Sequence, residues 1–288
     1  MRTALYLFTD DLRVSDNAAL HLCRGFERCE YVFVVHKTWF EKSQFVSRMG
    51  YGRWQFLLES LSNLQQQLNQ LGAHLHIIYA ENQTALDSLV QQSGASHLIV
   101  SRQFGWYEQQ FIQQLQTRHS LTLNTTDNST LFSAEGKPWL HTQLPGQYTP
   151  FRKLAEAETS QTPFADITEL PPNKLDPTPT LTLPDWLPSP SSVKTAFNGG
   201  EAAAKRHIEA YFSTTAPSTY KQTRNALEGW DNSSKFSPWL AVGCISPRQL
   251  LQRIEQYEQE HGANDSTYWL YFELLWRSIF NGLRLAAV

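Results

Sequence analysis

The chain has 288 residues, of which 41% are hydrophobic and 18% charged, and its formal net charge is −3. This composition is typical of a folded globular protein and excludes a wholly disordered chain. The near balance of acidic and basic residues excludes a uniformly basic nucleic-acid coat protein, although it permits a local basic groove. The length predicts two domains.

The cysteines and the N-terminus indicate the compartment. Cys23, Cys29 and Cys244 form no C-x-x-C pair, which predicts a reducing environment without a disulfide scaffold. The nine histidines lack a zinc-binding spacing, so no metal site is expected. The apolar run at the start is short and precedes two aspartates, as in a strand rather than a signal peptide, and no run approaches 18 apolar residues. We therefore expect a cytoplasmic protein that has no contact with a membrane.

Residues 1–130 alternate between short apolar runs and helical patterns. The apolar runs predict five strands, at Ala4–Phe8, Tyr31–Val35, His74–Tyr79, His97–Val100 and Ser120–Leu123. Apolar residues spaced by three and four predict helices between them, and the clearest helix runs from Trp54 to Leu71 and ends at Gly72. This alternation predicts an α/β domain, a Rossmann-like five-stranded parallel sheet with helices on both faces. Ligands of such sheets bind beyond the carboxyl ends of the strands.

The loop after the first strand has no glycine-rich dinucleotide fingerprint, and the chain has no P-loop motif. The sequence therefore lacks the signatures of ordinary NAD binding and of P-loop phosphate binding. Asp11 and Arg13 in this loop either belong to a site or, more simply, form an ion pair that fixes the turn.

Proline separates the two predicted domains. Eight of the fourteen prolines lie between Pro163 and Pro190, which is incompatible with a helix or a central strand. We therefore predict an extended interdomain linker over residues 131–195.

The pattern of residues 196–288 predicts helices only. Gly199-Gly200 opens the first helix, Ser237-Pro238 and Ser246-Pro247 each predict a capping serine with proline at the first helical position, and residues 264–266 cap the last helix.

Two groups of polar residues in the helical half are candidates for ligand binding. Residues 233–238, with the sequence Ser-Ser-Lys-Phe-Ser-Pro, combine three hydroxyl groups, a cation and a helix start, and are either a diphosphate site or a capped, solvated turn. In the last helix, spacings of three and four place on one face Trp269, Glu273, Trp276 and Arg277. Glu273 and Arg277 form either a plain surface ion pair or, with the two rings, a surface on which a flat ligand stacks.

Five ordered segments resemble the DNA photolyase/cryptochrome family, and their details are similar to its cryptochrome DASH branch: LFTDDLRVSDNAAL, GGEAAAKRHIEAYF, TYKQTRN, SSKFSPWLAVGCISPR and NDSTYWLYFELLWR. The resemblance extends to Arg277. It implies an N-terminal α/β antenna domain, commonly with 5,10-methenyltetrahydrofolate, and a C-terminal all-α domain that holds FAD. It also implies light-driven electron transfer from reduced FAD to a pyrimidine dimer flipped out of DNA, with single-stranded or looped DNA preferred in the DASH branch.

The resemblance also implies roles for individual residues. Glu273 matches a carboxylate that hydrogen-bonds the dimer bases, and Trp276 matches the ring on which the dimer stacks. Both are candidate catalytic residues. The candidate cofactor-binding residues are Tyr220, Ser233, Ser234, Lys235, Phe236, Ser237, Glu273 and Arg277.

The sequence departs from the family pattern in two places. Thr9 stands where many members carry arginine. After Arg277 the family continues with an acidic residue and a further aromatic run, whereas this chain reads SIFNGLR and ends at Val288. This predicts a C-terminally truncated, incomplete all-α FAD-binding domain with little or no photolyase activity on its own.

The same departure predicts that Trp269, Phe272 and Trp276 lack a partner layer, so that the last helix promotes self-association. Two other functions stay open. One is a non-catalytic light-sensing or antenna-pigment-binding protein that uses the α/β domain, and the other is a decayed fragment without pigment.

Overall fold

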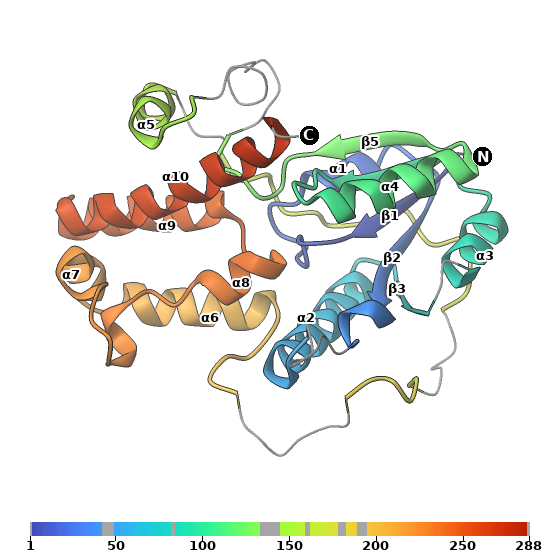
Figure 1. Cartoon of the computed structure of the whole chain (residues 1–288), viewed down its shortest axis with the longest axis horizontal. Coiled ribbons are helices and arrows are strands. Elements are labelled where there is room, and N and C mark those ends of the chain that lie inside the picture. Colours follow the sequence, from blue (N-terminus) through green and yellow to red (C-terminus); the bar gives the residue numbers. More distant parts are fainter. Residues whose placement is uncertain are drawn as a thin grey trace.

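The computed structural model describes residues 2–41, 49–81, 84–132, 145–158, 162–177, 183–188 and 195–286, with side chains in the last helix described up to Ile279. The first half forms a five-stranded parallel sheet with helices on both faces (Figure 1). The strand order is β3-β2-β1-β4-β5, and every pair is parallel. The strands are β1 (Thr3–Phe8), β2 (Arg28–His36), β3 (Leu75–Ala80), β4 (His97–Ser101) and β5 (Thr122–Thr126). The predicted Rossmann-like α/β fold is therefore confirmed.

Two predicted strands begin too early: β3 begins at Leu75, one residue after the predicted His74, and the larger difference is at β5. Ser120 is the C-cap of the preceding helix and has a left-handed backbone with φ of 53°. That conformation ends a helix and cannot start an extended strand, so β5 begins at Thr122.

In the described parts of the connections between the strands lie α1 (Ala18–Cys23), the 3-10 turn η1 (Lys37–Trp39), α2 (Tyr51–Gln70), α3 (Thr84–Ser93) and α4 (Trp106–His119). The two faces of β1 enter different cores because successive side chains of a strand point in opposite directions. Leu5 and Leu7 pack with residues of α3 and α4. Tyr6 and Phe8 belong to a larger core that continues into the second half.

The second half is helical, with α6 (Glu201–Phe212), α7 (Ala216–Thr223), η3 (Trp230–Asn232), α8 (Ser237–Val242), α9 (Pro247–His261) and α10 (Asp265–Ala286). Two of its predicted caps are confirmed. Ser246 forms a full capping box with Gln249, and the Asn264 side chain accepts hydrogen bonds from the backbone N–H groups of Ser266 and Thr267. The predicted cap at Ser237 is wrong, because Ser237 is already the first residue of α8 and the N-cap is Phe236, which makes no side-chain cap.

The proline-rich segment follows the sheet without forming regular structure over residues 162–177. Within the predicted linker, however, residues 148–156 form a helix, α5 (Tyr148–Glu156). Residues 133–144, 159–161, 178–182 and 189–194 of that linker lie outside the described residues. The domain boundaries at 130 and 195 stay predictions.

Glu30 fastens the linker to the sheet. Its carboxylate accepts hydrogen bonds from the backbone N–H groups of Lys174 at 2.8 Å and Leu175 at 3.0 Å, from the Asn173 side chain at 3.1 Å, and lies 2.9 Å from His76 Nε2. Burial raises the pKa of Glu30, but these hydrogen bonds outweigh it and the net pKa lies below its ordinary value.

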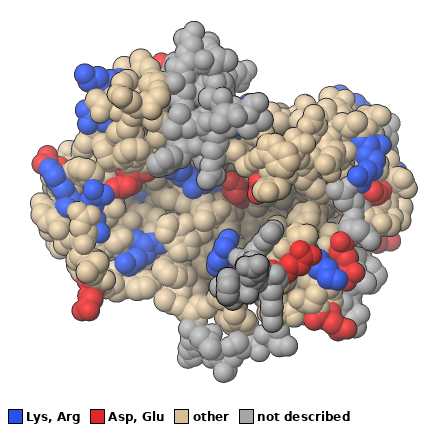
Figure 2. All heavy atoms as spheres, in the orientation of Figure 1, with Lys and Arg blue, Asp and Glu red and all other residues tan. Residues whose placement is uncertain are grey.

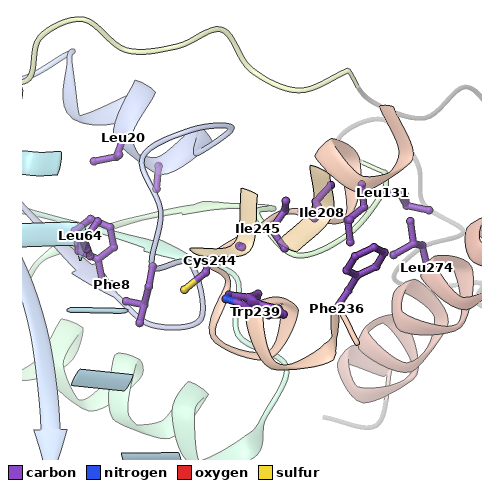
Figure 3. Close-up of a cluster of buried hydrophobic side chains, with 14 of the residues drawn as sticks. Phe8, Leu20, Leu64, Leu131, Ile208, Phe236, Trp239, Cys244, Ile245 and Leu274 are labelled. Carbon is purple, nitrogen blue, oxygen red and sulfur yellow. The ribbon is translucent and has the colours of Figure 1, made fainter. Parts of the chain in front are cut away.

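Asp16, in the loop between β1 and α1, joins the two halves. Its carboxylate forms an ion pair with Arg248 at 2.9 Å in which both side chains are fully buried, and it accepts a hydrogen bond from the Ser246 hydroxyl. Arg13 in the same loop donates to the backbone carbonyl groups of Gly243 at 3.0 Å and Asn128 at 2.7 Å. An apolar core also joins the two halves, and Figure 3 shows part of it, from Phe8 and Leu64 through Trp239 to Leu274.

The predicted ion pair between Asp11 and Arg13 is wrong. Asp11 accepts hydrogen bonds from the Tyr6 hydroxyl at 2.5 Å and from the Thr9 N–H group at 2.9 Å, whereas Arg13 binds carbonyl oxygens. Both side chains are buried and hold the loop in place. Among the described residues, no helix has both the length and the hydropathy needed to cross a membrane.

We predict that Arg248→Met lowers the free energy of unfolding by about 3–5 kcal/mol, because it leaves the Asp16 carboxylate buried without a counter-ion. Urea unfolding followed by circular dichroism measures this. Arg206→Met, at an exposed position of α6, serves as the control and should change stability by less than about 0.5 kcal/mol. Equal stability of the two variants would contradict the structural role of Asp16 and Arg248.

We also predict that Glu30 contributes to the stability of the folded protein and that acid removes this contribution. Because its folded pKa lies below the ordinary value of 4.5, its stabilisation is complete above about pH 4.5 and is lost as the pH falls through the folded pKa. Glu30→Gln should therefore be less stable than the wild type at pH 7 and lose less stability on acidification. Urea midpoints across this pH range test the expectation, with exposed Glu169→Gln as the control.

Candidate functional site

A cavity of about 510 Å³ lies in the helical half between the serine turn (residues 233–237) and α10. All eight predicted cofactor-binding residues line it, from α7, the serine turn and α10: Tyr220, Ser233, Ser234, Lys235, Phe236, Ser237, Glu273 and Arg277. The rest of the lining is apolar and comes from Leu240, Leu250, Ile254, Leu270 and Leu274. The cavity thus combines an apolar floor with a few converging polar groups, as binding sites for small organic ligands do.

The serine turn presents polar groups that the protein itself leaves unsatisfied. Among the described residues, no group accepts or donates a hydrogen bond to the hydroxyls of Ser233, Ser234 and Ser237, and the Lys235 ammonium forms no ion pair. Lys235 has a left-handed backbone with φ of 56°. Phe236 anchors the turn, because its buried ring packs against Tyr211 and Phe212. A rigid turn with free donors and one cation suits an anionic ligand.

Arg277 and Glu273 close the opposite side of the cavity. Arg277 donates to the backbone carbonyl groups of Ser129 at 3.2 Å and Leu240 at 3.0 Å. Glu273 forms its ion pair with Arg224 of the segment after α7, so the simple Glu273–Arg277 pair considered from the sequence does not form. Burial, followed by the charge of Glu273, raises the pKa of Tyr220 above its ordinary value. The tyrosine stays a neutral donor beside these charges.

Trp276 does not line this cavity. Its ring stacks on Tyr148 of α5, with ring centroids 3.7 Å apart and planes 11° from parallel. The Tyr148 hydroxyl also donates to the backbone carbonyl of Phe272 at 3.3 Å, and Tyr268 donates to Glu156 at the other end of α5 at 2.5 Å. Of the two predicted catalytic residues, Glu273 therefore lies in the cavity and Trp276 on a different side of α10.

The expectation of an uncovered aromatic face on α10 is wrong. Trp269, Phe272 and Trp276 are each half-buried. Tyr148 covers Phe272 and Trp276, and the Arg224 guanidinium lies over the Trp269 ring at 4.2 Å. Sequence reasoning missed α5 as the covering helix, although the spacing of Tyr148, Phe151 and Ala155 indicates an apolar helical stripe. Self-association through α10 stays a prediction.

A second, larger cavity of about 810 Å³ lies where the sequence predicted ligands, at the carboxyl ends of β1 and β2. Its lining includes Asp10, His36, Trp39, Trp106, Glu108 and Phe111, together with Ala241 and Val242 of α8. Burial lowers the pKa of His36 below its ordinary value, so the ring favours its neutral form. The cavity offers aromatic rings for stacking and carboxylates as acceptors.

The distribution of charge over the surface is mixed. On the face in Figure 2, lysine and arginine are scattered among acidic residues and do not gather into one continuous basic groove on its described part.

Comparisons with known proteins agree with these observations. A family model described as DNA photolyase matches residues 4–173. The chain is 36% identical to Cryptochrome DASH of Idiomarina loihiensis, covering 97% of this chain and 62% of that protein. It is 34% identical to Cryptochrome DASH of Xenopus laevis, covering 99% of this chain and 57% of that protein.

Two solved structures extend the comparison. A cryptochrome of Synechocystis sp. PCC6803 superposes with a TM-score of 0.88 at 32% identity, over 99% of this chain and 62% of that one. A class III photolyase of Agrobacterium tumefaciens gives a TM-score of 0.78 at 22% identity, over 99% of this chain and 59% of that one, which shows a shared fold. The chain thus spans between 57% and 62% of the length of these relatives.

We predict that Tyr148→Ala releases α5 from α10. Stacked aromatic pairs contribute about 0.5–1.5 kcal/mol beyond the area they bury, and alanine removes this contact together with the hydroxyl donor. Amide hydrogen exchange of residues 148–156 should become at least several-fold faster, while exchange in β1 stays unchanged. Tyr148→Phe keeps the stack and should exchange almost as the wild type does. Equal exchange in both variants would contradict the role of the stack.

Proposed function

Because the chain belongs to the DNA photolyase family, we propose that it is a light-driven flavoprotein of the cryptochrome DASH type, with FAD bound in the helical half. The observation that carries this proposal is the 510 Å³ cavity into which all eight expected cofactor-binding residues converge. Its volume lies in the range of cofactor sites, about 300–1,000 Å³.

The residues present fit a dinucleotide in charge and shape. The Lys235 ammonium and the three serine hydroxyls of the turn, which form no ion pair or hydrogen bond with the described part of the chain, suit a diphosphate. Leu250, Ile254 and Leu270 on the cavity floor suit the apolar surface of fused rings. Arg277 is held by two carbonyl groups and keeps a fixed orientation at the cavity wall.

Reduced FAD, when bound, supplies an electron to the substrate on absorbing light. The chain's own residues would orient the substrate. Glu273 forms an ion pair with Arg224 and lines the cavity, where its carboxyl oxygens would accept hydrogen bonds from the N–H edge of a pyrimidine. Trp276 stacks on Tyr148 on another side of α10, and its role as the ring on which a dimer base stacks stays a proposal.

The proposed substrate is a pyrimidine dimer in single-stranded or looped DNA. A base in a single strand has no pairing partner to lose, so flipping it out requires less free energy than in a duplex. We propose a cytoplasmic location for this activity.

The 810 Å³ cavity is the proposed site of an antenna pigment such as 5,10-methenyltetrahydrofolate. Trp39, Trp106 and Phe111 provide faces for a flat pterin ring, and Asp10 and Glu108 provide acceptors for its N–H groups. This cavity also supports the second candidate function, a pigment-binding protein without repair activity. Flavin absorption at near-stoichiometric occupancy favours the first function, and a folate-like band alone favours the second.

We predict that the chain binds FAD and that Lys235→Gln weakens this binding by about tenfold, because a charge-assisted contact with phosphate contributes about 1.5–3 kcal/mol. Titration of the purified chain with FAD, followed by quenching of flavin fluorescence, gives the dissociation constant. Lys153→Gln, an exposed lysine on α5, is the matched control and should bind as the wild type does. Failure of the wild type to bind FAD would refute the proposed function.

A further inference from the structure

We propose that His207 is a positioning residue that holds the serine turn in the shape that receives an anion. The inference rests on the diphosphate site proposed above and assigns to it a residue outside the cavity lining. His207 lies on α6, outside the set of residues that line the cavity, and no other part of the proposed function uses it.

The contact that carries the inference joins His207 Nε2 to the backbone carbonyl oxygen of Ser234 at 2.8 Å. A carbonyl oxygen only accepts, so Nε2 carries the hydrogen and donates it. The helix that carries His207 is anchored at its first residue, where the buried Glu201 carboxylate accepts a hydrogen bond from the Val14 N–H group at 2.8 Å. The hydrogen bond therefore ties the turn to a fixed element.

Aromatic rings on both sides of the turn hold the imidazole in place. It stacks on Trp239 of α8, with centroids 4.7 Å apart and planes 25° from parallel. It also forms T-shaped pairs with Phe236 and Trp230, with ring centroids 5.8 Å and 6.4 Å apart. Trp239 is itself fixed, because its indole N–H donates to the Asn198 carbonyl at 3.0 Å. Residues before, within and after the turn thus converge on one imidazole.

The consequence for the turn follows from the planarity of the peptide bond. In a trans peptide the carbonyl oxygen and the next N–H group point in opposite directions. Fixing the Ser234 carbonyl on His207 therefore directs the Lys235 N–H away from α6, and keeps a carbonyl dipole away from an anion. It also holds Lys235 in its left-handed conformation, which a non-glycine residue adopts only at a conformational cost.

Inorganic pyrophosphate is the probe for this inference, with FAD as the second ligand, and the whole chain is used. His207→Phe keeps an aromatic ring but removes the donor. We expect the dissociation constants of both ligands to rise about tenfold, as the loss of one hydrogen bond predicts. His207→Gln restores a side-chain N–H and should bring binding back to within about threefold of the wild type. If the ring only fills space, His207→Phe should bind both ligands more tightly than His207→Gln does.

A matched control is His261→Phe in α9. His261 also stacks on an aromatic ring, that of Tyr257 at 4.3 Å, and contacts a backbone carbonyl at 3.2 Å, but it lies outside the cavity. This variant should bind both ligands as the wild type does. Wild-type affinity in His207→Phe would overturn the inference alone. Absence of pyrophosphate and FAD binding in the wild type would refute the proposed function and the inference together.

Discussion

The buried ion pair between Asp16 and Arg248 is the constraint on which the arrangement of the two halves depends. Both side chains are excluded from water, so each charge needs a counter-ion and hydrogen-bond partners inside the protein. Asp16 satisfies this with Arg248, the Ser246 hydroxyl and the Phe164 N–H group, so one carboxylate binds α9, its cap and the linker. The loop after β1 therefore fixes where α9 begins, and with it the position of α8 just before.

Gly243 makes this arrangement specific. It has φ of 71°, and a Cβ atom at this position would lie 1.8 Å from the Asp10 carbonyl oxygen, so the loop and the end of α8 touch backbone to backbone. The six-residue α8 is consequently a wall between the two cavities. Leu240 faces the smaller cavity, and Ala241 and Val242 face the larger. A displacement of α8 would change both proposed binding sites together.

Local rules predicted most of the fold and little of the packing. Strands such as β1 are buried on both faces and read as continuous apolar runs, and caps such as Ser246 have a fixed local chemistry, so both follow from sequence. Contacts between distant residues do not. Nothing local to Asp11 and Arg13 predicts that the arginine binds Asn128 and Gly243 instead of its neighbour.

The candidate site shows the same limit within a single helix. Residues of a helix are about 100° apart, so Glu273 and Arg277 lie about 40° apart while Trp276 lies about 60° from Glu273 on the other flank. A shared face judged from spacing alone is broad enough to hold all three. In the structure this face meets two different partners. Glu273 and Arg277 line the cavity, whereas Trp276 stacks on Tyr148 of α5. Which flank meets which partner depends on α5, more than a hundred residues earlier in the chain, and so the position of Trp276 could be found only from the folded protein.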